Sequence, residues 1–239
     1  MKTTLKNALY ACVMIFPAVL TLSAQQPDKD NPRPFTQILQ QDQCTFASSG
    51  RNAYSILQPG YQMVYQGMDG KDKVDLVITV TNETRKIGNV ETRVVTEDES
   101  VNGSIIEKSR NFFAFCKETS SIYYFGEEVD IYKDGKITDH EGQWIAEGPN
   151  KCGVDMPGLP LIGARFFQEI APDVAMDRIE IISIGETYDV PAGSFKNCLR
   201  TQETTPLEPG DLEYKVFAPG VGLLQDETAK LIKYGFVKL

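Results

Sequence analysis

The chain has 239 residues, of which 24 are basic and 33 acidic, giving a net charge of −9. An acidic chain without a local cluster of Lys and Arg is repelled by nucleic acids and by anionic membrane surfaces, so no nucleic-acid partner is expected. The length fits a single β-rich domain with a sizeable core.

Residues 1–24 have the layout of a secretory signal peptide. Two lysines precede an apolar run over residues 8–22, and small residues lead to Ala24. The run is shorter than the roughly 20 residues of a spanning helix, and it contains Pro17. We therefore expect cleavage, and no transmembrane span after processing. Cys12 follows too few apolar residues for a lipoprotein signal.

Cleavage would leave an exported protein, periplasmic or extracellular. It removes two lysines and no acids, so 22 basic residues face 33 acidic ones and the net charge becomes −11. Residues 25–34 are polar and proline-rich, which indicates a flexible tether. The β-rich domain is expected over residues 35–239. Pro34 favours a short helix over Phe35 to Gln43 at its start.

From Tyr61 onward the apolar residues repeat with a period of two, which predicts strands. Asn102-Gly103 is the strongest hairpin signal. Thr81 to Thr84 reads as a polar connection. Isoleucines near residue 180 indicate either two covered faces or a bulge. The predicted strands cover residues 61–66, 74–80, 90–97, 105–117, 123–125, 129–132, 165–170 (strand or helical turn), 177–188 and 229–237, with further strands inside 185–224.

Residues 185–224 form the clearest framework of the sheet. Pro191 with Gly193, Pro209-Gly210 and Pro219-Gly220 each suit a turn. In the strand near residue 215, Leu212, Tyr214, Val216 and Ala218 share one face, and Glu213, Lys215 and Phe217 share the other. By contrast, residues 145–163 are rich in Gly and Pro and are expected to form a long ordered loop.

The predicted fold is all-β and mostly antiparallel. Strands follow one another as a meander, with at most one or two short helices, so we expect a large curved sheet that forms a half-barrel or a barrel.

Four cysteines remain after processing, namely Cys44, Cys116, Cys152 and Cys198. An oxidising compartment permits one or two disulfides, and four cysteines allow three full pairings, among which the sequence does not choose. Their spacing matches no zinc or thioredoxin-like motif.

No catalytic or metal-binding signature is present, and no cofactor is expected. His140, the single histidine, could act as a general base or a ligand, but its position also suits a polar turn. Ser104 and Ser194 lie in turns without the context of a hydrolase nucleophile. Cys198 alternates with Lys196 and Arg200, yet a disulfide or an inert thiol explains it better.

Aromatic residues gather in the predicted strands. They fill the core, or they line an apolar trough on the concave face of an incompletely filled sheet. The candidate ligand-binding residues are Tyr65, Phe113, Tyr124, Trp144, Met156, Phe167 and Tyr214.

Three strings carry a resemblance: YYFGEEVDIYKDGKITDHEGQW, VDMPGLPLIGARFFQEIAPDVAMDRIE and VPAGSFKNCLRTQETTPLEPGDLEYKVFAPGVG. Over about residues 120–226 the chain resembles an uncharacterised family of secreted bacterial β-rich proteins. More loosely, it is similar to the lipoprotein-carrier half-barrels of the cell envelope, which implies an envelope role by analogy of architecture.

The leading hypothesis is a non-enzymatic envelope protein that holds an apolar, lipid-like ligand or a partner segment on its curved sheet. An interaction or structural module of an envelope complex is the alternative, using an edge strand or residues 145–163. A hydrolase that uses His140 is the third.

Overall fold

The computed structural model describes residues 33–239. The predicted signal peptide, and the predicted tether up to residue 32, lie outside the described residues. Residues 34–239 form one compact unit. Its strands are antiparallel, and apart from a single 3₁₀ turn (η1, Gln41–Gln43) residues 33–239 contain no helix, so the all-β prediction is confirmed. No helix in this range is long and apolar enough to cross a membrane.

The strands are β1 (Phe46–Ala47), β2 (Gly50–Arg51), β3 (Ile56–Leu57), β4 (Tyr61–Asp69), β5 (Asp72–Ile87), β6 (Val90–Val101), β7 (Ser104–Cys116), β8 (Ile122–Lys133), β9 (Lys136–Asp139), β10 (Trp144–Ile145), β11 (Lys151–Met156), β12 (Arg165–Phe167), β13 (Glu169–Ile170), β14 (Arg178–Val190), β15 (Gly193–Thr204), β16 (Glu213–Ala218), β17 (Gly222–Asp226) and β18 (Ala229–Phe236).

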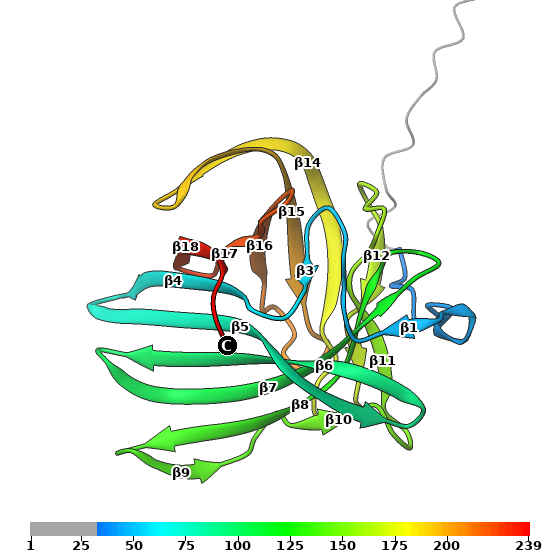
Figure 1. Cartoon of the computed structure of the whole chain (residues 1–239), viewed down its shortest axis with the longest axis horizontal. Helices are drawn as coiled ribbons and strands as arrows, with labels where there is room; N and C mark the ends of the chain where they lie inside the picture. Colours follow the sequence, from blue (N-terminus) through cyan, green and yellow to red (C-terminus); the bar gives the residue numbers. More distant parts are fainter. Residues whose placement is uncertain (1–32) are drawn as a thin grey trace, which may run out of the picture. The chain divides into compact units, whose positions relative to one another are not determined.

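The main sheet follows the order β12-β14-β15-β16-β17-β18-β4-β5-β6-β7-β8-β11-β13. Neighbouring strands are consecutive in the chain along most of this path, as the predicted meander requires. The pairing of β18 with β4 joins the two ends of the meander. The sheet bends through 320° and is nearly closed into a barrel. Figure 1 shows β4 to β8 as one curved layer facing β14 to β16 across the interior.

Residues 165–170 bring the two edges of the sheet together. Arg165–Phe167 pairs with β14, and two residues later Glu169–Ile170 pairs with β11 on the opposite edge. The backbone of this closing segment passes very near Gly153 of β11, where a Cβ atom would lie 2.3 Å from the carbonyl oxygen of Gln168. Glycine at position 153 therefore permits the approach of the two edges.

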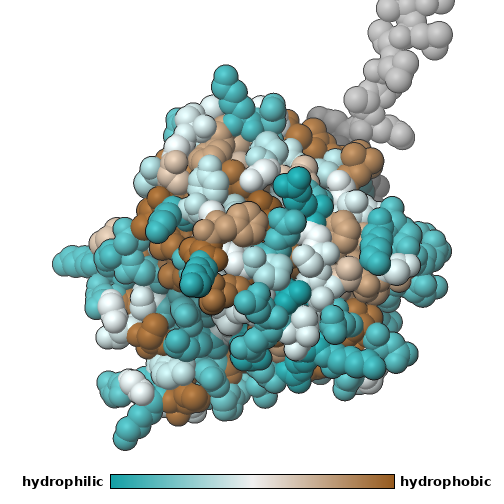
Figure 2. All heavy atoms as spheres, viewed as in Figure 1, coloured by the Kyte–Doolittle hydropathy of each residue, from teal (hydrophilic) through white to brown (hydrophobic). Residues whose placement is uncertain are grey.

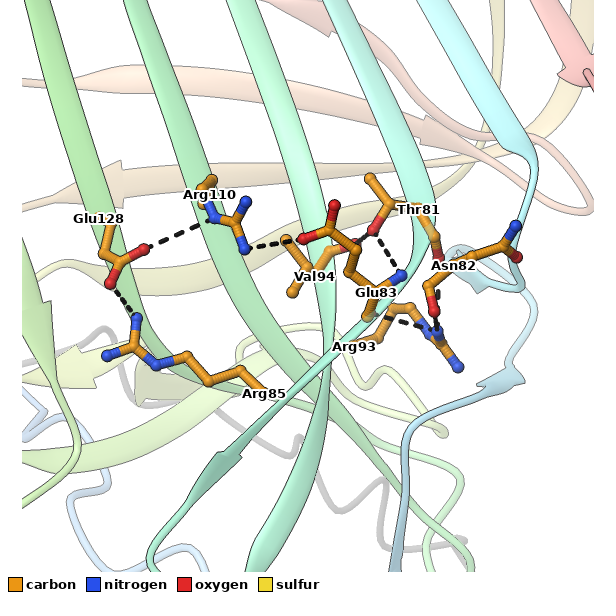
Figure 3. A network of polar contacts seen from close by, with 8 residues as sticks. All are labelled: Thr81, Asn82, Glu83, Arg85, Arg93, Val94, Arg110 and Glu128. Carbon is orange, nitrogen blue, oxygen red and sulfur yellow. Dashed lines mark hydrogen bonds and ion pairs between the residues drawn. The ribbon is translucent and has the colours of Figure 1, made fainter. Parts of the chain in front are cut away.

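The predicted polar connection at Thr81 to Thr84 is wrong, because β5 continues through it as a bulge. The guanidinium of Arg93 donates hydrogen bonds to the carbonyl oxygens of Asn82, at 2.9 Å, and Glu83, at 3.2 Å (Figure 3). Its Nε also donates to the carbonyl oxygen of Ser48 at 2.7 Å. The bulge leaves these carbonyl groups without a backbone partner in the neighbouring strand, and the side chain of Arg93 supplies the hydrogen bonds instead.

Two further expectations need correction. The predicted helix over Phe35 to Gln43 is reduced to η1, because Thr36 is extended and exchanges backbone hydrogen bonds with Arg165 and Phe167. The predicted long loop over residues 145–163 contains β11, which pairs with both β8 and β13. Its glycine content reflects close packing of backbones, as at Gly153, as well as turns.

The structure confirms the predicted hairpin and shows which cysteines are paired. Asn102 and Gly103 have φ of 52° and 81° between β6 and β7, as expected for a two-residue hairpin loop. Cys44 and Cys116 form a disulfide. The thiols of Cys152 and Cys198 are free and buried.

The buried apolar residues form two clusters. The first is centred on β4, β5 and β16 to β18 and includes Tyr65, Val216 and Leu231. The second, around β7, β8, β11 and β14, includes Phe112 and Met156. On the face seen in Figure 2, apolar surface is broken into patches among hydrophilic residues.

Candidate functional site

The inside of the curved sheet holds a cavity of about 480 Å³. Its walls come from β6, β7, β8 and β11 on one side and from β15 and β16 on the other, so it lies within the barrel. Nine acidic residues and a single lysine line it, and Leu207, Glu208 and Asp211 form part of an exposed rim. The cavity is therefore open at that rim and strongly acidic. The acidic residues are Glu97, Glu127, Asp155, Glu169, Asp177, Glu203, Glu208, Asp211 and Glu213.

A smaller cavity of about 160 Å³ has a mostly apolar lining. The segment that carries β3 forms one border of this smaller cavity. The side-chain amide of Asn52 fixes the segment by donating hydrogen bonds to the carbonyl oxygens of Ser120, at 3.1 Å, and Met156, at 3.3 Å. Its apolar lining is Tyr54, Ile56, Leu57, Met63, Ile78, Val80, Val95, Phe113, Ile122, Phe217 and Leu223.

The two cavities share Glu97, Phe113, Asp155, Gln168, Glu203 and Lys215. We call these six residues the junction. Each lies on a strand of the sheet except Gln168, which lies in the closing segment between β12 and β13. A molecule that enters from the acidic rim therefore meets the junction before it reaches the apolar end.

Lys215 provides the positive charge of the junction. Its Nζ lies 3.1 Å from Oε2 of Glu203 and 3.6 Å from Oδ1 of Asp226. Burial alone would lower the pKa of Lys215, but Asp226 and Glu203 outweigh this effect and raise that pKa well above its usual range. Lys215 is therefore protonated and does not act as a nucleophile.

Several cavity carboxyl groups are held away from bulk water. Burial raises the pKa of Glu97 to about 8, and raises the pKa values of Asp155, Glu127 and Glu213 to about 7. Burial also raises the pKa of Glu169 well above its usual range. In the unliganded cavity Glu97, Asp155, Glu127 and Glu213 therefore exchange protons near neutral pH, because burial and neighbouring carboxylates disfavour their charged forms.

The seven residues predicted to bind a ligand fall into three groups: those near the acidic cavity, those in the core, and Tyr214 at the surface. Phe113 and Tyr124 line the acidic cavity with rings stacked at a centroid distance of 4.8 Å, and Trp144 packs edge-on against Tyr124 at 5.3 Å. Tyr65, Met156 and Phe167 are buried and contribute to neither cavity wall. Tyr214 is 41% exposed and also lies outside both.

The side chain of Tyr124 is fixed by a hydrogen bond that its hydroxyl donates to Oδ1 of Asn111 at 2.6 Å. The indole Nε1 of Trp144 is buried without a hydrogen-bond partner among residues 33–239. Trp144 is the register partner of Glu127, so its side chain projects from the same face of the sheet as that cavity-lining carboxylate. Phe113 and Tyr124 therefore belong to the cavity wall, and the buried Trp144 packs against Tyr124 without lining the cavity.

His140 lies apart from both cavities. Its Nδ1 is 2.7 Å from the carbonyl oxygen of Val129 and 3.1 Å from Oδ1 of Asp130, and its side chain is 54% exposed. Within residues 33–239 no hydroxyl or thiol group is hydrogen-bonded to its ring. The geometry matches the polar turn considered from the sequence.

The ionisable residues of the junction were not among the residues selected from the sequence. A signal was present, since Glu97 is in phase with Val95 on β6, and Lys215 with Phe217 on β16. An ionisable side chain on the buried face of a strand is unusual and marks a candidate site.

Comparison with protein families, with curated proteins and with solved structures finds no match to the chain.

Proposed function

We propose that the protein is an exported, non-enzymatic binding protein whose barrel takes up a ligand with an apolar portion. The observation that carries this proposal is the pair of cavities that meet at the junction, the larger one open at an exposed rim and the smaller one lined mainly by apolar side chains. Preformed concave sites with apolar walls and a few polar groups are typical of small-molecule binding. The N-terminal sequence and the Cys44–Cys116 disulfide support export to an oxidising compartment.

Titration with phenylnaphthylamine, an uncharged dye that fluoresces in apolar surroundings, tests this function. The protein should be purified from the exported fraction, where its first residue is expected to be Gln25. We expect saturable binding of about one dye per chain, because the apolar end has room for a single slender molecule.

Leu223→Trp fills the apolar cavity and should weaken dye binding about tenfold or more, whereas Tyr214→Trp adds a similar ring outside it and should leave binding unchanged. Leu223 is only partly buried, so the larger side chain is compatible with folding. Dye binding that is absent, or that both variants weaken equally, would contradict the proposal.

A further inference from the structure

We propose that the junction binds the positively charged headgroup of an amphiphile, a protonated amine whose apolar chain extends into the inner cavity. This inference rests on the proposed function, because the apolar end must accept the chain of the same ligand.

The first argument is the state of Glu97 and Asp155. Both side chains are partly buried and line the two cavities, and within residues 33–239 neither has a hydrogen bond or an ion pair. Asp155 lies at the bulge of β11, between Val154 and Met156. An enclosed carboxylate without a partner is costly, and a donor supplied by a ligand removes that cost.

The second argument is the charge of the wall. Lys215 makes its ion pairs with Glu203 and Asp226, and its charge only partly offsets the burial of Glu97 and Asp155, whose pKa values stay raised. Nine acidic residues and one lysine line the larger cavity, and a cation entering from the rim is attracted along its whole length.

The third argument concerns the kind of cation. In the described part of the chain, the one group of three side chains able to bring ligand atoms together for a metal ion is Cys44, Cys116 and Glu118, whose cysteines form the disulfide. Within residues 33–239, therefore, no three cavity carboxylates place their oxygen atoms close enough together to share one metal ion. An ammonium group with several N–H donors at the end of an apolar chain fits such a spread arrangement better.

The aromatic wall agrees with this assignment. Phe113 belongs to the junction and stacks on Tyr124. A ring face beside a cation contributes a favourable cation–π interaction when water is excluded. Carboxylates and an aromatic face thus border the headgroup, and aliphatic side chains border the chain.

The test compares three amphiphiles of equal chain length, decylamine, decanol and decanoate, by calorimetry at about pH 8.5, where the carboxyl groups are largely ionised. We expect decylamine to bind about tenfold or more tightly than decanol, and decanoate to bind most weakly. The double variant Glu97→Gln with Asp155→Asn should lose about tenfold in decylamine affinity and retain its affinity for decanol. Glu141→Gln, at an exposed turn, is the matched control and should change neither.

Equal affinity for decylamine and decanol in the wild-type protein would overturn the headgroup assignment while leaving the dye result, and therefore the proposed function, intact. Failure of all three amphiphiles together with the dye would overturn both. Saturable binding of calcium chloride alone that the double variant abolishes would assign the junction to an inorganic cation instead. If the double variant does not fold, two other results still test the headgroup assignment. These are the decylamine affinity of Asp155→Asn alone and the ratio of the decylamine and decanol affinities of the wild-type protein.

Discussion

Glu97 shows how one side chain links the cavity to the stability of the protein. It faces Lys215, Asp226, Glu127 and Asp155 across the interior. Three of these four neighbours are acidic, so the electrostatic environment adds to burial in raising the pKa of Glu97 to about 8. In the unfolded chain this group titrates near 4.5. Between these values the folded protein holds a proton that the unfolded chain has released.

The unliganded protein should therefore lose stability as pH rises from about 5 to 8.5, since the folded state binds more protons than the unfolded state over this range. Glu97→Gln removes this contribution. Between about pH 5 and 8.5 we expect the free energy of unfolding of the wild type to fall by about 1–2 kcal/mol more than that of the variant. This value is smaller than the full pKa shift would give, because water in the cavity screens the charge of Glu97. Urea titrations at several pH values measure the difference. Glu141→Gln should follow the wild type, and parallel curves for Glu97→Gln would refute the prediction.

Of the seven side chains selected from the sequence as candidate ligand contacts, Phe113 and Tyr124 line the acidic cavity, and the other five line neither cavity. Strand alternation is a local property of the sequence, so it indicated which segments form strands and which of these carry aromatic residues. It did not reveal that Glu97, Asp155 and Lys215 meet, because they come from β6, β11 and β16, which lie far apart in the chain.

Among the elements, the bulge of β5 depends on a side chain from β6. Arg93 is 7% exposed, and its guanidinium serves carbonyl groups of both β5 and Ser48. Arg110 and Arg85 also belong to the polar network of Figure 3, where both pair with Glu128 at the surface. The two kinds of arginine should differ strongly in energetic importance, because exposed ion pairs are screened by water.

Arg93→Ala is expected to reduce the free energy of unfolding by about 1–3 kcal/mol, since it removes a buried side chain that donates hydrogen bonds to the carbonyl groups of Ser48, Asn82 and Glu83. Arg110→Ala, which removes surface ion pairs only, should cost less than about 1 kcal/mol. Urea denaturation monitored by circular dichroism gives both values. Similar losses for the two variants would show that Arg93 does not support the bulge.

The same bulge explains why Thr81 to Thr84 was read as a connection. Its polar residues interrupt the alternation, and no local signal shows that Arg93 holds the strand together there. Where turn chemistry is local, as at Asn102-Gly103, the sequence predicted the element correctly.

For the whole molecule, the meander could be predicted but its closure could not. Sequential strands and turns are encoded nearby in the chain, whereas the pairing of β18 with β4 and the meeting of both edges at residues 165–170 are long-range. The choice between a half-barrel and a barrel depended on these contacts. The closing segment also supplies Gln168 to the junction, so the meeting of the two sheet edges completes the wall of both cavities.

Gly153→Ala tests the closure, because its Cβ would meet the backbone of Gln168 and Phe167. We expect a loss of about 2–3 kcal/mol in the free energy of unfolding. Hydrogen exchange should accelerate in residues 151–156 and 165–170 if the two edges separate. Gly70→Ala, at an open hairpin tip with φ of 59°, should cost about 1 kcal/mol and leave exchange in these segments unchanged. Unaltered exchange in Gly153→Ala would contradict the assigned role of the glycine.

The pairing of β18 with β4 also sets the order of events during biosynthesis. β18 follows the other strands of the described sheet in the chain, so β4 cannot pair with it until that strand has been synthesised. Cys44, which precedes β1, and Cys116, at the end of β7, emerge much earlier than β18, so their disulfide can form before the sheet is complete once both reach an oxidising compartment. Because contacts between residues far apart in the sequence form slowly, we expect the pairing of β18 with β4 to be a late step of folding.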